Sequence, residues 1–146
     1  MVRSYQVYWI ENEFADYFYG RERTFYNLFS QLESAKGSLH TIINTQVNYI
    51  TKPIPFLPTK RMIEQGLSKK DSIKPKDNEM IVEESGCGAK IVITERCIKL
   101  DVWGTKDWES FFFEILRKSD QKLLAIDLKN ERFGWLKPIK QRKYIY

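Results

Sequence analysis

The side chains that most often carry out chemistry are scarce in this sequence. Its single histidine, His40, follows Leu39 in a predicted helix but lies off the apolar stripe of that helix, which predicts a surface position. A metal site usually draws on several His or Cys residues at close spacing, and a nucleophile paired with a histidine would depend on His40 alone. Carboxylate pairs such as Glu11 and Glu13 are expected by chance among 19 acidic residues. We therefore predict no catalytic residue, no metal ligand and no cofactor.

Residues 85–90 (SGCGAK) contain two glycines and a lysine, as phosphate-binding loops do. Such a loop needs the pattern G-x-x-x-x-G-K-[ST] between a strand and a helix. Here Ile91 occupies the Ser/Thr position and a strand is expected to follow, so a hairpin turn is the simpler interpretation. Cys87 lies between the glycines, but the sequence shows no neighbouring base to activate it. An enzyme that uses Cys87 is an alternative that replacement of this thiol would test.

Composition limits the class of protein. The 146 residues are 42% hydrophobic and 14% aromatic, which is enough for one core, so residues 1–146 are expected to form a single domain. Two cysteines, Cys87 and Cys97, are too few for a secreted disulfide framework and are interpreted as reduced thiols. The N-terminus lacks an apolar signal sequence, and no stretch approaches the ~18 apolar residues of a membrane span. We therefore expect a cytoplasmic protein that does not contact a membrane.

Hydrophobic periodicity predicts mostly helices in the first half of the chain. A strand is expected at residues 3–10, with helices at 12–19, 23–34 and 38–50. Asn12 and Ser38 are the expected caps, Gly20 should end the first helix, and prolines from Pro53 onward should end the third. Residues 59–78 are rich in lysine and are expected to form an exposed loop with one short helix. The apolar stripe of the third helix is predicted to comprise Leu39, Ile42, Ile43, Val47 and Ile50.

The period changes to two in the second half. Strands are expected at residues 80–84, 90–95, 97–103, 123–128 and 132–136, with a helix at 106–118 capped by Thr105. Apolar and polar residues alternate from Ile98 to Val102, which favours an antiparallel sheet with one face toward a core and one toward water. The predicted fold class is α+β, a single domain whose helices cluster in the N-terminal half and pack on a mostly antiparallel sheet.

Aromatic residues gather in the first predicted helix. Phe14 and Phe18 lie four residues apart and share one helical face, whereas Tyr17 and Tyr19 point elsewhere. One helix cannot bury rings around its whole circumference, and exposed aromatic residues are typical of the core of a protein interface. The alternative is that Phe14 and Phe18 simply pack on the sheet.

A nucleic-acid-binding module is a second alternative. The net charge is +5, and basic residues concentrate in the 60–76 loop and in the C-terminal tail. Such segments can follow a phosphate backbone, but the sequence carries no RNA-recognition signature or stripe of stacking aromatic residues. Under this alternative, function would depend on four tail residues, Lys137, Lys140, Arg142 and Lys143.

Several uncommon motifs, in this order and spacing, resemble those of the SirA family of sporulation inhibitors of replication. They are residues 8–15 (YWIENEFA), 19–22 (YGRE), 46–55 (QVNYITKPIP) and 112–116 (FFEIL), and then Asp127 with 132–136 (RFGWL). The motifs run from one end of the chain to the other, while residues 59–100 contribute little to the resemblance.

The resemblance implies a non-enzymatic, cofactor-free cytoplasmic protein that is made at the commitment to sporulation. Members of this family bind the N-terminal domain of the replication initiator DnaA and block new rounds of chromosome replication. The family's contact surface includes the first helix and the helix before the Ile-Pro segment, to which Phe14, Phe18 and Asn48 correspond here. The family pattern has tyrosine in place of Phe18 and glutamine in place of Asn48. Loss of the tyrosine hydroxyl removes one interfacial hydrogen bond, worth ~1 kcal/mol.

These two lines of reasoning lead to one predicted site. We expect the partner, the N-terminal domain of DnaA, to contact Phe14, Phe18 and Asn48 together with the neighbouring Ala15, Tyr17 and Thr51. The interface should be small. The protein is expected to be a monomer or to form a 1:1 heterodimer with its partner, and direct binding of nucleic acid is not expected. The hypothesis for the mechanism is occlusion of a surface that the initiator needs.

Overall fold

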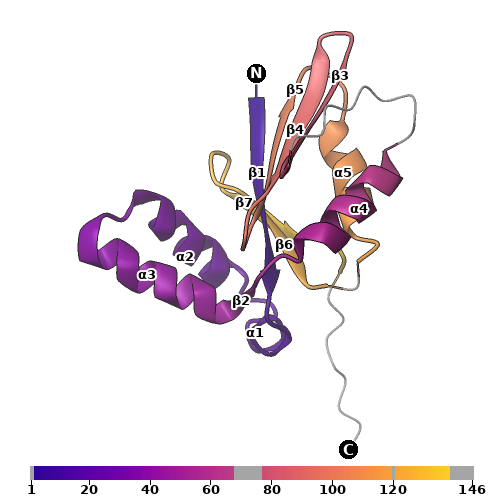
Figure 1. The fold of residues 1–146 in the computed structure, drawn as a ribbon. Coiled ribbons are helices and arrows are strands. Elements are labelled where there is room, and N and C mark those ends of the chain that lie inside the picture. The colour runs from indigo at the N-terminus through magenta and orange to yellow at the C-terminus, as the bar shows by residue number, and fades with distance from the viewer. Residues whose placement is uncertain (1, 68–76, 120, 139–146) are drawn as a thin grey trace, which may run out of the picture.

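The computed structural model describes residues 2–67, 77–119 and 121–138. Within these residues the chain forms one seven-stranded sheet with helices on both of its faces (Figure 1). Every strand pairing in the sheet is antiparallel. The predicted α+β fold class with an antiparallel sheet is therefore confirmed.

The first strand lies at the centre of the sheet and joins its two halves. The strand order is β3-β4-β5-β1-β6-β7, and β2 pairs with the last residues of β1. β1 pairs with β5 along residues 2–7 and with β6 along residues 6–9, so that a single strand joins both. The strands are β1 (Val2–Ile10), β2 (Thr51–Lys52), β3 (Glu79–Glu84), β4 (Cys87–Ile93), β5 (Ile98–Trp103), β6 (Leu123–Asp127) and β7 (Arg132–Trp135).

The helices divide into two groups, one on each face of the sheet (Figure 1). Side chains alternate along a strand, so Val7 of β1 joins the core beneath one group and the adjacent Tyr8 joins the core beneath the other. The helices are α1 (Asn12–Tyr17), α2 (Arg23–Ser34) and α3 (Gly37–Ile50) on one face, and α4 (Phe56–Gly66) and α5 (Trp108–Leu116) on the other.

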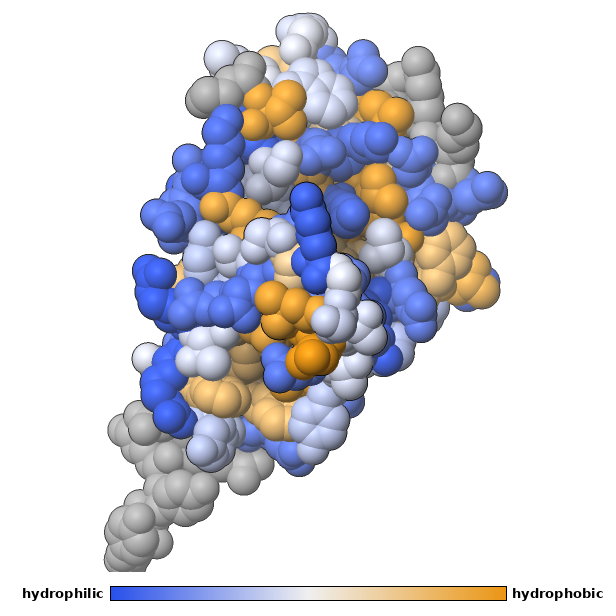
Figure 2. All heavy atoms as spheres, turned by 90° about the vertical axis from the view of Figure 1, so that its left-hand side faces the viewer, coloured by the Kyte–Doolittle hydropathy of each residue, from blue (hydrophilic) through white to orange (hydrophobic). Residues whose placement is uncertain are grey.

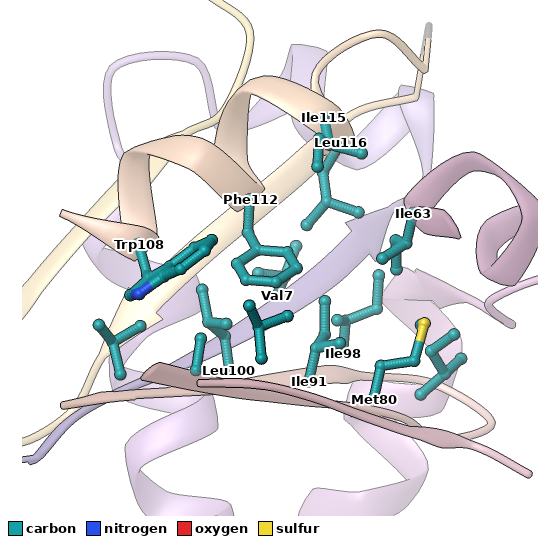
Figure 3. Close-up of a cluster of buried hydrophobic side chains, with 14 of the residues drawn as sticks. Val7, Ile63, Met80, Ile91, Ile98, Leu100, Trp108, Phe112, Ile115 and Leu116 are labelled. Atoms are coloured by element: carbon teal, nitrogen blue, oxygen red, sulfur yellow. The ribbon is translucent and has the colours of Figure 1, made fainter. Parts of the chain in front are cut away.

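The larger core lies between the sheet and the helices α4 and α5 (Figure 3). Phe112 of α5 is fully buried there and its ring is 5.6 Å from that of Phe111. Asp107 caps α5, because its side chain accepts a hydrogen bond from the backbone N–H of Ser110 at 3.1 Å. The helix is thus fixed at its first turn and along its apolar face.

The second core lies between the sheet and the helices α1 to α3. Tyr8 of β1 stacks on Phe29 of α2, with ring centroids 3.9 Å apart and planes within 4°. Ala15, Ile43 and Val47 complete the contact from α1 and α3. This core holds both α1 and α3 against the same end of the sheet, near β2 (Figure 1).

The structure corrects several expectations about helices. Residues 56–66 form the full helix α4, where a loop with one short helix was predicted; residues 68–76 lie outside the described part of the chain. Pro58 is the third residue of α4 and lies in its first turn, where a backbone N–H has no partner within the helix, so it does not break the helix. Thr59 and Ile63, four residues apart, supply the buried face of α4.

The predicted N-terminal helix caps were also wrong, and the apolar stripe predicted for α3 is confirmed only for Ile43, Val47 and, in part, Ile50. Glu11, Lys36 and Asp107 precede α1, α3 and α5, in place of Asn12, Ser38 and Thr105. The alternation predicted from Ile98 to Val102 is confirmed in β5, where Ile98, Leu100 and Val102 are buried and Lys99 is exposed. Strand β6 does not alternate, because all five of its residues are buried between the two cores. Leu39 and Ile42 of α3, expected in the core, are each 55% exposed.

Candidate functional site

Helix α1 is short and holds its aromatic side chains at the boundary between core and solvent. Ala15 is fully buried and anchors the helix, while Phe14 and Phe18 are half-buried on the same side. The ring of Phe18 packs edge-on against Phe25 of α2 at 5.3 Å and against Tyr17 at 4.9 Å. Each ring therefore touches the core and still reaches the surface, and a role of Phe14 and Phe18 in an interface stays a prediction.

Helix α3 lies beside this aromatic group and exposes most of its length. Ile43 and Val47 face the core, and Tyr49 on the outer side is 71% exposed. The rings of Phe14 and Tyr49 meet with centroids 5.2 Å apart and a tilt of 59°. The rings of α1 and α3 thus form one continuous surface.

The outer face of α3 carries no formal charge. Its sequence, GSLHTIINTQVNYI, contains no Asp, Glu, Lys or Arg, although these residues make up 29% of the chain. Surface positions on a helix are usually charged, and depletion of charge distinguishes the centre of a protein interface from the rest of a surface. Hydrophobic side chains accordingly gather in the middle and lower part of the face that α2 and α3 present in Figure 2.

We refer to the side chains that reach the surface from α1, from Phe18 directly after it and from α3 as the α1–α3 surface. At its edge, the guanidinium of Arg21 lies over the rings of Tyr17 and Phe18, at 5.1 and 5.3 Å, and donates a hydrogen bond to the carbonyl oxygen of Tyr17 at 2.8 Å. These contacts restrain the exposed ring of Tyr17 and the half-buried ring of Phe18. The α1–α3 surface comprises Phe14, Tyr17, Phe18, Leu39, Ile42, Asn48 and Tyr49.

The predicted site residues divide into exposed and buried ones. Tyr17 is 66% exposed and Asn48 is exposed, next to the tyrosine that Phe14 contacts. Ala15 and Thr51 are buried, and the hydroxyl of Thr51 donates a hydrogen bond to the carbonyl oxygen of Val47 at 2.7 Å. A role of these two residues in partner binding remains a prediction, and burial limits that role to supporting the helices.

Sequence reasoning missed Leu39, Ile42 and Tyr49 as members of this surface. Leu39 and Ile42 fitted the helical period of a buried stripe, and the period alone does not tell which apolar residue a neighbouring element covers. The signal that was available is the absence of charge along the whole of α3. His40 is exposed, as predicted.

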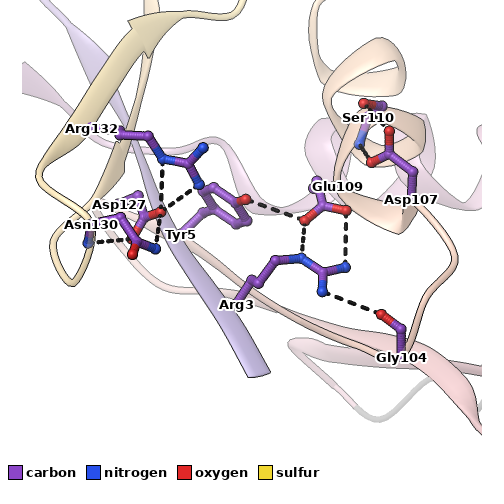
Figure 4. Close-up of polar contacts among 9 residues, drawn as sticks. All are labelled: Arg3, Tyr5, Gly104, Asp107, Glu109, Ser110, Asp127, Asn130 and Arg132. Atoms are coloured by element: carbon purple, nitrogen blue, oxygen red, sulfur yellow. Dashed lines mark hydrogen bonds and ion pairs between the residues drawn. The ribbon is translucent and has the colours of Figure 1, made fainter. Parts of the chain in front are cut away.

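A second group of polar residues joins β1 to α5 and closes the turn between β6 and β7 (Figure 4). Arg3 forms an ion pair with Glu109, which also accepts a hydrogen bond from the hydroxyl of Tyr5 at 3.2 Å. Burial and the adjacent Glu109 raise the pKa of Tyr5. The carboxylate of Glu109 is thus occupied by a cation and a hydroxyl, which is an arrangement that ties elements together and leaves no free acid or base.

Asp127 closes the turn between β6 and β7 in the same group. Burial alone would raise its pKa, but hydrogen bonds from Asn130 and Arg132 outweigh burial and hold the pKa below the ordinary value. The side-chain amide of Asn130 and the guanidinium of Arg132 both donate to Asp127 Oδ2 at 2.9 Å. This buried carboxylate therefore stays ionised at neutral pH and acts as a structural acceptor.

The glycine-containing segment at residues 85–90 is a hairpin turn, as predicted. Ser85 and Gly86 have φ angles of 50° and 79° and connect β3 to β4, where Glu84 pairs with Cys87. The backbone N–H of Lys106, with the hydroxyl of Thr105, lowers the pKa of the Cys87 thiol. Both cysteines are free, and no group of three or more His, Cys, Asp or Glu side chains in the described part of the chain could hold a metal ion.

Two remaining expectations concern membranes and nucleic acid. None of the helices within the described ranges is long and apolar enough to cross a membrane. Lys137 of the basic tail is exposed, whereas Lys140, Arg142 and Lys143 and most of the lysine-rich 60–76 segment lie outside the described residues. The nucleic-acid alternative therefore remains a hypothesis.

Comparison with known proteins gives two matches that span the chain. The sequence model of the family described as sporulation inhibitor of replication protein SirA matches residues 3–140. The sporulation inhibitor of replication protein SirA of Bacillus subtilis (strain 168) is 32% identical over 148 residues, which cover 99% of this chain and 100% of that relative. The resemblance that the sequence motifs indicated is thereby confirmed.

Proposed function

This chain belongs to the family of the sporulation inhibitor of replication protein SirA, and from that premise we propose that it inhibits chromosome replication by binding the N-terminal domain of the initiator DnaA. The family establishes the coarser role, that of a regulatory protein that inhibits replication in sporulation. The identity of the partner and of the contact residues is our proposal. We also propose that the chain acts as one cytoplasmic domain that forms a 1:1 complex.

The observation that carries this proposal is the α1–α3 surface. It combines aromatic rings that are half in the core with a helix that has no charged side chain, and both features are typical of protein interfaces. Charged side chains are unfavourable at the centre of an interface because each charge must be desolvated when the partner binds. An aromatic ring already held by its neighbours loses little conformational entropy on binding.

Each side chain has a proposed part in the contact. Phe14 and Phe18 present ring edges that would fill apolar pockets of the partner, and Tyr49 extends this apolar centre onto α3. Asn48 provides a polar group at the edge, with donors and an acceptor that can pair with backbone or side-chain groups. Once bound, the inhibitor would cover a surface of the initiator domain that other replication proteins or other initiator copies need.

The test is a calorimetric titration of the purified chain against the isolated N-terminal domain of DnaA from the same organism. Phe14→Ala and Phe18→Ala should each weaken binding by about 2 kcal/mol or more if these rings are hot spots. The matched control is Leu57→Ala, which removes an exposed apolar side chain from α4 on the opposite face of the sheet. Circular dichroism would show that each variant is folded.

The outcomes separate the proposal from its alternatives. Binding by the unaltered chain, lost in Phe14→Ala or Phe18→Ala and kept in Leu57→Ala, supports the inhibitor role through the α1–α3 surface. Absence of binding at tens of micromolar would refute the proposed partner. Salt-dependent binding to DNA that depends on Lys137, Lys140, Arg142 and Lys143 would favour the nucleic-acid alternative.

A further inference from the structure

The C-terminal end of α3 meets three other parts of the chain through its backbone carbonyl groups. The last four carbonyl oxygens of any helix have no partner within the helix and need donors from elsewhere. Here the carbonyl of Val47 accepts the backbone N–H and the hydroxyl of Thr51, the latter at 2.7 Å. The carbonyl of Ile50 accepts the backbone N–H of Glu11, the residue that precedes α1, at 2.8 Å. This end of α3 is therefore bonded directly to the start of α1.

The third contribution comes from the sheet, through Arg96. Its Nη1 donates to the carbonyl oxygens of Asn48 at 3.2 Å and of Thr51 at 2.9 Å, and it lies 3.5 Å from the hydroxyl oxygen of Thr51. A positive charge at a helix C-terminus is favourable because the helix dipole and the open carbonyl groups are negative there. One nitrogen atom thus binds both the last turn of α3 and the residue that follows it.

The turn that carries Arg96 is itself held in place. It connects β4 to β5, and the hydroxyl of Thr94 donates to the carbonyl of Cys97 at 2.7 Å and accepts the backbone N–H of Cys97 at 3.1 Å. The neighbouring Glu95 accepts the backbone N–H of Ile54 at 2.7 Å through its carbonyl oxygen. Arg96 therefore reaches α3 from a rigid support, across 45 residues of sequence from Thr51.

We propose that Arg96 is a positioning residue for the α1–α3 surface. It holds the helix end that carries Asn48 and Tyr49 at a fixed angle to α1, so that the rings of Phe14 and Tyr49 are already together before a partner binds. Preorganisation of this kind strengthens binding because less order has to be imposed when the complex forms. The inference rests on the proposed function of this surface, and Arg96 itself does not need to touch the partner.

The experiment compares three full-length variants with the unaltered chain. Arg96→Ala removes the contacts, and Arg96→Lys keeps a charged nitrogen, which should restore much of their effect because all three contacts come from one nitrogen. Arg117→Ala is the matched control, since it removes the same charge from an exposed ion pair with Glu114 at the end of α5. Affinity for the DnaA N-terminal domain is measured by calorimetry, and backbone amide exchange by NMR.

We expect Arg96→Ala to weaken binding about tenfold, Arg96→Lys to recover most of that loss, and Arg117→Ala to bind like the unaltered chain. In the free protein, Arg96→Ala should raise amide exchange about tenfold at Glu11 and Thr51, whose N–H groups bond to the end of α3, and leave α5 unchanged.

Three results would overturn the inference. The first is binding by Arg96→Ala within twofold of the unaltered chain. The second is an equal loss of affinity in Arg117→Ala, which would show that the effect depends on net charge and not on Arg96. The third is unchanged exchange at both Glu11 and Thr51 in Arg96→Ala. If the unaltered chain does not bind the domain, the proposed partner is wrong, and the exchange at these two amides still decides whether Arg96 positions α3.

Discussion

Helix α5, on one face of the sheet, buries four of its nine residues, whereas α3, on the other face, buries two of its fourteen. Two acidic residues of α5 are paired with arginines: Glu109 with Arg3 of β1, and Glu114 on the outer side with Arg117. The outer side of α3 has no charged residue and exposes Leu39, Ile42 and Tyr49. The two helices therefore differ in the fraction of residues that they bury and in the charge that they carry, although each packs on the same sheet.

This difference indicates that one face of the sheet mainly stabilises the fold and that the other is suited to binding. The core under α4 and α5 gathers most of the large buried side chains and supplies much of the stability of the fold. Helices α1 and α3 are attached by a smaller core and leave an apolar, uncharged surface open to solvent. Such a surface costs solubility when free, which is why its presence on a small protein points to a partner. Changes on one face should mainly affect stability, and changes on the other should mainly affect binding.

The largest effect is expected from Phe112→Ala in the core beneath α5. Phe112 is fully buried, and truncation of such a ring typically lowers the free energy of unfolding by about 3–5 kcal/mol. Urea unfolding measures this loss. The fraction of the variant that remains folded at low temperature should still bind the partner domain normally, and weakened binding by that folded fraction would show that the two faces are not independent.

A smaller effect, on binding alone, is expected from Thr45→Glu on the outer side of α3. Thr45 is exposed, so the change should alter the free energy of unfolding by no more than about 0.5 kcal/mol. Thr45 lies between Ile42 and Tyr49 along α3, so a new charge there would have to be desolvated when the partner binds, and the free energy of binding should become less favourable by about 1–2 kcal/mol. Gln65→Glu adds the same charge to the exposed side of α4 and should leave affinity unchanged. An equal loss of affinity in both variants would mean that net charge, and not the α1–α3 surface, controls binding.

The smallest effect is confined to acid and concerns stability. The folded-state pKa of Asp127 is below its ordinary value, so its ionised form stabilises the fold above the pKa of the unfolded state, about 4. That contribution is lost as the pH falls through the folded-state pKa. The difference in unfolding free energy between the unaltered chain and Asp127→Asn should therefore be larger at pH 7 than at pH 3. A constant difference across this range would show that the ionised carboxylate is not what stabilises the turn.

The two faces also differ in how well their features could be predicted from the sequence. The strand period and the strong apolar face of residues 106–118 led to the correct sheet class and to α5. Helix α4 was predicted only as one short helix within a loop, because Pro58 was interpreted as a break, and the place of Pro58 in a first turn depends on where the helix begins. Phe14 and Phe18 were singled out by two signals together, the excess of aromatic rings in the first helix and the resemblance to the SirA family. Arg96 could not, because its contact with α3 depends on how a turn of the sheet meets the helix.

The central claim is that a partner binds the face formed by α1 and α3. Hydrogen exchange of the full chain, with and without the N-terminal domain of DnaA, tests it most directly. We predict slower exchange on binding in α1 (Asn12–Tyr17) and α3 (Gly37–Ile50), and unchanged exchange in α4 (Phe56–Gly66) and α5 (Trp108–Leu116). Protection centred on α4 and α5, with none on α1 and α3, would contradict the account.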